Sequence, residues 1–357
     1  MKRIGILTSG GDCQGLNAAI RGVCKALYEH FDNVEIYGIF DGYRGLIEGE
    51  YRLMQPSEFS GILTLGGTIL GTSRQPFKLM QIIGENEVDK VSKMKKNYAK
   101  MKLDCLVVLG GNGTHKTAHL LSNQGLNVVS LPKTIDNDLW GTDVTFGFQS
   151  SVDVATDVID AIHTTATSHG RIFIIELMGH KAGWLTLHAG IAGGADIIVL
   201  PEIPYRLESI VSTLNERTKK GKQFSILAVA EGALSKEESM MSKKEFRQKR
   251  LAAPHLAVSY QLAADLQNKM GQEIRMVIPG HYQRGGSPCA FDRVLASRLG
   301  AGAAGFIGKN IYGVMAAMVS GEVVPVPLGE VAGKLKQVPV DSSLIQTARN
   351  LGVGFGD

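Results

Sequence analysis

Short apolar runs that end in glycine-rich turns recur along this chain, and a helical pattern follows most of them. Three of these turns also carry polar and charged side chains: 8–12 (TSGGD), 110–114 (GGNGT) and 132–138 (PKTIDND). A repeated strand, turn and helix order predicts a doubly wound α/β fold around a mostly parallel sheet. Such sheets bind ligands beyond the carboxyl ends of their strands, which is where all three turns fall.

The expected strands are short and rich in Val, Ile and Leu, as in sheets that are covered on both faces. They span residues 2–7, 34–40, 104–109, 127–131, 171–177, 196–200, 224–230 and 274–278. Helical spacing of apolar residues is clearest over 16–27 and 151–168. The pattern restarts near residue 147. We therefore expect two Rossmann-like doubly wound lobes with a cleft between them.

Composition is that of a globular enzyme. The 357 residues, 44% hydrophobic and 20% charged, suffice for two domains, and no apolar run is long enough to span a membrane. The net charge of +4 suits anionic metabolites and does not indicate nucleic acid. Four scattered cysteines and no signal-peptide pattern favour a reducing cytoplasm. The charged segment 235–250 is expected to be a solvated excursion, with a polyanion site as the alternative.

The first two turns favour phosphate binding. Glycine-rich turns expose backbone N–H groups, and the helix that follows adds partial positive charge. Either turn alone could be a simple tight connection, but two of the same design in one lobe favour function. Neither matches the dinucleotide fingerprint, and the chain has no Walker sequence.

The third turn adds groups that phosphoryl transfer requires: a carboxylate near the acceptor hydroxyl, and cations. In an extended segment Asp136 and Asp138 point in different directions, so one can act as a base while the other holds Mg²⁺. Lys133 supplies a fixed positive charge beside them. The alternative is an Asx-rich turn with solvated carboxylates.

Further basic side chains could bind phosphate groups. They are Arg74, Arg171, Arg275, His281 and Arg284. Arg275 lies within an apolar strand pattern, and burying its guanidinium would require an anionic partner. The others could equally be surface or capping residues.

The chain resembles the 6-phosphofructokinase family over nearly its full length. The resemblance is carried, in order, by GILTSGGDCQGLNAAIRG, GGTILGTSR, LGGNGT, PKTIDNDLWGTD, TFGF, ELMGHKAGW, AGGAD, AEGA and GHYQRGGSPCAFDRVLASRLG. It implies phosphoryl transfer to the 1-hydroxyl of fructose 6-phosphate with Mg²⁺, in a homotetramer or homodimer with shared sites. It implies a donor lobe (1–147 plus about 283–333) and a sugar-phosphate lobe (148–282 plus about 334–357).

The resemblance also implies individual roles. Asp136 is the base, with Thr134 and Lys133 beside the transferred group, while Asn112 and Asp138 hold the metal. Donor contacts are Gly11, Tyr43, Arg74, Lys78, Gly110, Gly111, Asn112, Gly113 and Thr114. Sugar-phosphate contacts are Thr134, Asp136, Asp138, Met178, Gly179, His180, Glu231, His281 and Arg284, with Arg171 and Arg275 reaching the site of a neighbouring subunit.

The chain departs from the family pattern at three positions. Asn112 stands where an aspartate is usual, so Mg²⁺ would rely more on Asp138 and on the phosphates. His180 replaces a usual arginine, which weakens the cationic help near the transferred group unless Lys181 substitutes. Thr117 replaces a small residue and is expected to crowd the adenine site.

Two positions bear on the identity of the phosphoryl donor, and they favour different donors. Gly113 resembles ATP users, because an aspartate there would repel an α-phosphate. Lys133 resembles pyrophosphate users. We favour ATP, since steric room is necessary for ATP and an added lysine does not forbid it; pyrophosphate is the alternative.

Other interpretations of single residues and of the function remain. Residues that resemble parts of a bacterial effector site could equally be ordinary surface charge: Arg21, Lys25, Asp196, Lys220 and Lys222. A catalytically silent sugar-phosphate-binding subunit would be consistent with Asn112 and His180, but the intact Asp136 argues against it. Lipid and NAD kinases share a GGDGT-like turn but lack the PKTIDND and GHYQRGG strings.

Overall fold

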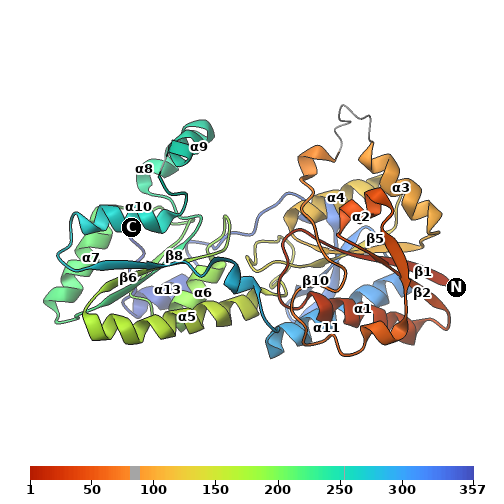
Figure 1. The fold of residues 1–357 in the computed structure, drawn as a ribbon, viewed down its shortest axis with the longest axis horizontal. Helices are drawn as coiled ribbons and strands as arrows, with labels where there is room; N and C mark the ends of the chain where they lie inside the picture. The colour runs from red at the N-terminus through yellow and green to blue at the C-terminus, as the bar shows by residue number, and fades with distance from the viewer. Residues whose placement is uncertain (81–88, 253) are drawn as a thin grey trace. The chain divides into compact units, whose positions relative to one another are not determined.

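The computed structural model describes residues 1–80, 89–252 and 254–357, and the chain divides into two units (Figure 1). The first comprises Met1–Ile135, Leu139–Ser150 and Arg284–Leu335, and the second comprises Asp136–Asp138, Ser151–Gln283 and Lys336–Asp357. The segment Asp136–Asp138 groups with the second unit, whereas the sequence placed it in the first. No described helix is both long and apolar enough to cross a membrane. A cleft between the units stays a prediction.

The first unit is built on a seven-stranded sheet in the order β11-β10-β5-β4-β1-β2-β3. Its strands are β1 (Lys2–Ser9), β2 (Val34–Ile39), β3 (Tyr51–Met54), β4 (Cys105–Gly110), β5 (Val128–Pro132), β10 (Val314–Val319) and β11 (Glu322–Pro327). Only the edge strands β3 and β11 pair antiparallel to their neighbours in this sheet. The helices of this unit are α1 (Leu16–His30), α2 (Tyr43–Glu48), α3 (Lys90–Lys100), α4 (Asn112–Asn123), α11 (Ala290–Gly308) and α12 (Leu328–Val331), with the 3₁₀ turns η1 (Pro56–Phe59) and η2 (Phe77–Leu79).

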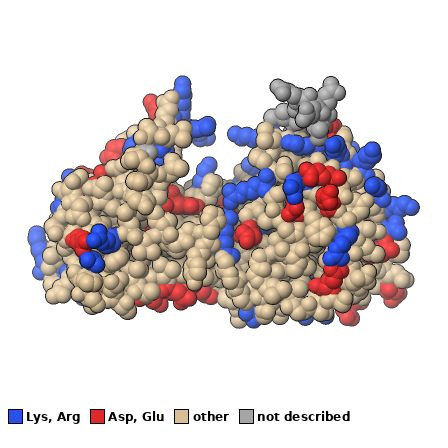
Figure 2. All heavy atoms as spheres, in the orientation of Figure 1, with Lys and Arg blue, Asp and Glu red and all other residues tan. Residues whose placement is uncertain are grey.

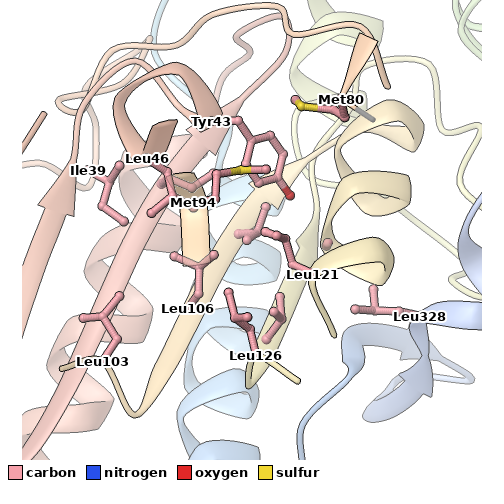
Figure 3. Packing of buried hydrophobic residues seen from close by; sticks show 14 of the residues in the cluster. Ile39, Tyr43, Leu46, Met80, Met94, Leu103, Leu106, Leu121, Leu126 and Leu328 are labelled. Carbon is pink, nitrogen blue, oxygen red and sulfur yellow. The ribbon is translucent and has the colours of Figure 1, made fainter. Parts of the chain in front are cut away.

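All residues of β4 and β5 are buried, so the centre of this sheet is covered on both faces. Figure 3 shows an apolar core cluster in which Tyr43, Met94, Leu106 and Leu121 pack together. Helices α1 and α11 pack against each other (Figure 1). Their contact needs Gly300, since a Cβ there would lie 2.6 Å from the backbone nitrogen of Val23. This packing fixes the sheet edge from which the glycine-rich turns project.

The second unit has a four-stranded parallel sheet in the order β7-β8-β6-β9. Its strands are β6 (Ile172–Leu177), β7 (Ile197–Val199), β8 (Ser225–Ala230) and β9 (Ile274–Val277). Its helices are α5 (Phe148–His169, which begins in the first unit), α6 (Trp184–Ala192), α7 (Leu207–Lys219), α8 (Lys236–Ser239), α9 (Lys243–Ala252), α10 (Val258–Gln267) and α13 (Ser343–Asn350), with η3 (Gly280–Arg284). Apolar residues of the strands pack against α7 and α10 in a core of their own.

The predicted α/β class, the eight predicted strands and both predicted helices are confirmed, with ends shifted by a few residues. The excursion over 235–250 is confirmed as well: it forms most of α8 and α9, whose side chains are largely exposed. Figure 2 shows Lys and Arg gathered at this projecting segment. The strands β3, β10 and β11 were not predicted.

Candidate functional site

The three polar turns of the sequence meet at one edge of the first sheet. Strands β1, β4 and β5 are neighbours, and the register places Ser9 opposite Gly110 and Gly110 opposite Pro132. The chain leaves β1 through Gly10, whose φ of 88° favours glycine. The carboxyl edge predicted to bind ligand therefore carries the TSGGD and GGNGT turns and the start of PKTIDND side by side.

Helix α4 presents an uncapped N-terminus at this edge. Its N-cap, Gly111, supplies no side-chain hydrogen bond, so the first backbone N–H groups of the helix are available to an anion. Gly113 is exposed, and a Cβ added to it would meet nothing within 4 Å. The loop thus combines phosphate-binding donors with open space beyond them.

Buried side chains brace this first turn. The Tyr43 hydroxyl donates to the Thr114 carbonyl at 3.0 Å, and the Thr114 hydroxyl lies 3.3 Å from the Ser9 carbonyl. Tyr43 is almost fully buried, so in this structure it supports the loop, and its contact with a donor stays a prediction. Thr117 is also buried, with its hydroxyl 3.4 Å from the Gly113 carbonyl, and the expectation that it crowds the adenine site stays a prediction.

Two cations flank the TSGGD turn. The buried Lys133 donates from its ammonium group to the Gly11 carbonyl. The guanidinium of Arg284 lies so close to Gly11 that a Cβ there would collide with it, and its Nε is buried without a hydrogen-bond partner among the described residues. Arg284, predicted to bind sugar phosphate, therefore lies against the predicted donor turn.

The segment before η2 is tied to the same turn. The Gly10 N–H donates to the Ser73 carbonyl at 3.1 Å, and the Thr72 hydroxyl donates to the Gly10 carbonyl at 2.7 Å. This pairing carries the exposed Arg74 to the glycine turn. Lys78 is exposed further along, in η2, so its contact with a donor stays a prediction.

The carboxylate-bearing segment is bent, so the expectation of an extended chain is wrong. Asn137 has a left-handed φ of 51°, which breaks the alternation of side chains between Asp136 and Asp138. Lys336 holds the bend: its Nζ donates to Asn137 Oδ1 at 3.0 Å and its N–H to the Asp138 carbonyl at 2.8 Å. Asp138 is buried and Asp136 is partly exposed. Thr134 precedes the bend, and its carbonyl accepts a hydrogen bond from a threonine hydroxyl.

The residues present fit a magnesium ion held mostly by substrate. No group of three or more His, Cys, Asp or Glu able to hold a metal occurs within the described part of the chain. The Asn112 amide donates to the Lys334 carbonyl at 2.6 Å, and its Oδ1 has no hydrogen-bond partner among the residues that the structure describes. Mg²⁺ commonly takes one or two protein oxygens and completes its shell with phosphates and water.

In the second unit, Glu231 organises the loop that follows β6. Leu177 and Ala230 lie opposite each other in register, so the loops after β6 and β8 are neighbours. Glu231 Oε1 accepts the backbone N–H groups of Gly179 and His180 at 3.3 and 2.7 Å. His180 has a φ of 52°, an uncommon conformation for a residue other than glycine.

This loop borders a cavity of about 450 Å³ lined by His180, Lys181 and Glu231 among others. Phe246 and Arg250 of α9 line it as well. The sequence favoured a solvated segment there, with a polyanion site as the alternative. The four-residue spacing of Phe246 and Arg250 places them on one face of a helix, but it does not indicate that this face borders a cavity.

Three other predicted sugar-phosphate contacts do not line this cavity: Met178 and Gly179, which precede His180 in its loop, and His281, which lies in η3. The buried Gln283, which was not predicted from the sequence, accepts the Met178 N–H at 3.3 Å.

Arg275 lies within an apolar strand pattern but is not buried, so it needs no internal anionic partner. It lies on the edge strand β9, and its side chain is 54% exposed. Arg275 and Arg171 both pair with Glu273, so the two arginines expected to act together do lie together. The hydrogen bond from Arg171 is the main cause that lowers the pKa of Glu273.

Of the residues that resemble an effector site, Asp196 has an internal partner. It pairs with Arg217 at 2.7 Å and accepts the Ile226 N–H at 2.9 Å, and burial raises its pKa. The other four lie apart in the chain: Arg21 and Lys25 on α1, and Lys220 and Lys222 after α7. Their role stays a prediction.

A family model described as Phosphofructokinase matches residues 3–307. The chain belongs to the phosphofructokinase family. It is 58% identical to a Spirochaeta thermophila protein named ATP-dependent 6-phosphofructokinase, over 100% of this chain and 98% of that one. A Propionibacterium freudenreichii protein of the same name is 48% identical, over 99% of each chain.

Solved structures agree on the fold. Phosphofructokinase from Pichia pastoris superposes with a TM-score of 0.77 at 32% identity, over 92% of this chain but only 35% of that longer one. A pyrophosphate-dependent phosphofructokinase from Marinobacter aquaeolei gives a TM-score of 0.80 at 21% identity, over 99% of this chain and 88% of that one. At 21% identity, the likeness to the Marinobacter aquaeolei protein shows a shared fold and nothing more.

Proposed function

We propose that this protein transfers the γ-phosphoryl group of ATP to the 1-hydroxyl of fructose 6-phosphate, giving fructose 1,6-bisphosphate and ADP in glycolysis. The observation that carries the proposal is the uncapped N-terminus of α4 beside the cationic TSGGD turn, with open space at Gly113. This arrangement supports a donor whose phosphate chain continues into a nucleoside. The names of full-length relatives at 58% and 48% identity support the same donor.

In the proposed reaction, Asp136 accepts the proton of the 1-hydroxyl as that oxygen attacks the γ-phosphorus. The new bond joins the sugar oxygen to phosphorus, and the bond from the γ-phosphorus to the oxygen it shares with the β-phosphate breaks. Lys133 offsets charge near the transferred group, and the backbone N–H groups of α4 hold the donor phosphates. A magnesium ion held by Asn112, Asp138 and the phosphates would neutralise further negative charge.

The second unit is proposed to hold the sugar phosphate. Glu231 and His180 line its cavity, and a carboxylate fixed by two backbone N–H groups can accept hydrogen bonds from sugar hydroxyls. Lys181 and Arg250 line the same cavity and supply positive charge. They are our candidates for the cationic help that His180 no longer gives.

Pyrophosphate is the second candidate donor. Lys133 favours it, because a buried ammonium group beside the glycine turn compensates the charge of a short polyanion. Gly113 argues against it, since the open space there serves no part of pyrophosphate.

We further propose a cytoplasmic homotetramer or homodimer in which Arg171 and Arg275 serve a neighbouring subunit's sugar phosphate. Their exposure, and their shared ion-pair partner Glu273, suit an anion that arrives from outside the subunit.

The experiment that tests the proposed function is identification of the product. Purified protein is incubated with fructose 6-phosphate, Mg²⁺ and ATP, and the mixture is followed by ³¹P NMR. The proposal predicts a new phosphate resonance coupled to the C1 protons and one ADP per sugar phosphorylated. ADP formation without sugar phosphorylation would contradict it.

A further inference from the structure

The side chain of His115, in the first turn of α4, has no role in the function proposed above. It is fully buried, and its Nδ1 lies 2.8 Å from the Gly111 carbonyl oxygen. A carbonyl oxygen only accepts, so Nδ1 carries the proton. Nε2 is buried and has no hydrogen-bond partner among the described residues. Burial lowers the pKa of His115 to about 4, which keeps the ring neutral.

The Gly111 carbonyl therefore accepts two hydrogen bonds, because the backbone N–H of His115 also donates to it at 3.0 Å. In a trans peptide the carbonyl of one residue and the N–H of the next point in opposite directions. Holding the Gly111 carbonyl toward the body of the helix fixes the Asn112 N–H outward. That N–H is the first of the uncapped donors at the N-terminus of α4.

The rest of the turn is built in the same way. Tyr43 donates to the Thr114 carbonyl, and the Thr117 hydroxyl lies within reach of the Gly113 carbonyl. Each of these hydroxyl groups contacts a backbone carbonyl oxygen, and the N–H of the same peptide group points in the opposite direction. His115 differs from the other two because its acceptor, Gly111, is the N-cap residue and precedes the regular helix. Gly111 also lacks a side chain that could restrain its own peptide.

We infer that His115 is a positioning residue for the phosphoryl donor: its Nδ1–H fixes the Gly111–Asn112 peptide so that the N–H groups of α4 meet the donor phosphates already aligned. The inference rests on the proposed function for the identity of the donor. It does not require His115 to touch the donor or to change its protonation state during turnover. The expected effect lies on donor affinity and not on the sugar phosphate.

Substitutions separate this role from simple space filling. His115→Asn keeps an N–H donor near the Nδ1 position but is smaller, whereas His115→Phe fills the site without a donor. His115→Leu is a second variant without a donor, for use if the larger phenyl ring does not fit. The probe is a non-hydrolysable ATP analogue with an imido β–γ bridge, bound with Mg²⁺ and measured by calorimetry beside the melting temperature of each variant.

We expect the analogue to bind His115→Phe and His115→Leu about three- to tenfold more weakly than wild type, as for loss of one neutral hydrogen bond. His115→Asn should lose less affinity although it is the least stable of the three. The KM for fructose 6-phosphate should not change. Affinity that follows melting temperature, with Asn weakest and Phe near wild type, would overturn the inference. If wild type binds the analogue but does not phosphorylate fructose 6-phosphate, the proposed function is contradicted. The comparison of analogue affinities among the variants still tests the role of His115.

Discussion

Gly113 is the residue at which a substitution should best distinguish ATP from pyrophosphate as the donor. It is exposed, lies in the first turn of α4 and has no neighbour that a Cβ would meet. Substitution there should leave the fold unchanged, and an acidic side chain in a first helical turn even suits the helix dipole. Effects on turnover can therefore be assigned to the donor.

We predict that Gly113→Asp lowers kcat/KM for ATP far more than for pyrophosphate. A carboxylate about 4 Å from an α-phosphate at a partly desolvated surface is repelled by up to ~4 kcal/mol. Initial rates with each donor measure the effect, and Gly113→Asn is the size-matched neutral control. Equal losses for Asp and Asn would mean that size decides, and no loss with either would place the donor elsewhere.

Asp136 carries the proposed base, and it is the more exposed of the two carboxylates in its segment. Asp136→Ser should reduce kcat by roughly 10²–10⁴-fold, the usual worth of general base catalysis. The melting temperature should stay close to that of wild type. Near-normal turnover in a folded variant would show that another group takes the proton.

At the scale of elements, the sequence predicted the buried parallel strands well because they are continuous apolar runs bounded by glycine or polar residues. The antiparallel additions gave weaker signals. β3 is four residues long, and β11 is partly exposed and contains prolines. The exposure of Arg275 was not predictable, because an apolar strand pattern does not reveal whether a strand lies at the edge of its sheet.

The parts of the candidate site that lie in short continuous segments were predictable from the sequence. The parts that depend on contacts between distant segments were not. The turns after β1, β4 and β5 were located from sequence, since parallel topology brings such turns together. The bend at Asn137 was not, because its left-handed backbone is stabilised by Lys336, far away in sequence. Phe246 and Arg250 were missed because tertiary folding alone brings α9 to the cavity.

Helix α4 should make the protein sensitive to acid. The pKa of His115 falls from its ordinary value of 6.5 to about 4, chiefly through burial, and Lys133 opposes its protonation too. The unfolded chain thus binds a proton that the folded one does not. This contribution to stability is complete above pH 6.5 and is lost as the pH falls toward 4.

The measurement is the free energy of unfolding in urea at pH 7 and pH 5 for wild type and His115→Asn. Between these values wild type should lose roughly 2 kcal/mol more than the variant, which lacks the titrating group. Parallel losses in the two proteins would mean that His115 is readily protonated in the folded state.

At the scale of the whole molecule, the account requires that subunits share sites. Arg171 lies just before β6, and Arg275 lies on the edge strand β9 of the second sheet. Both arginines pair with Glu273. A sugar phosphate from a neighbouring subunit would compete with Glu273 for these arginines.

We predict that mixing inactive Asp136→Ser subunits with inactive Arg275→Ala subunits restores activity after dissociation and reassembly. Some sites then receive an intact half from each parent. Each parent reassembled alone is the control, and native mass spectrometry verifies that hybrids form. Proven hybrids without activity would mean that each site is built within one subunit.

The most direct test of the central claim is the choice of donor by the wild-type protein. Initial rates are measured with saturating fructose 6-phosphate and Mg²⁺ while either ATP or pyrophosphate is varied. We predict that kcat/KM for ATP exceeds that for pyrophosphate by roughly tenfold or more, because the ratio of the two values measures differential transition-state binding. A higher kcat/KM for pyrophosphate would contradict it.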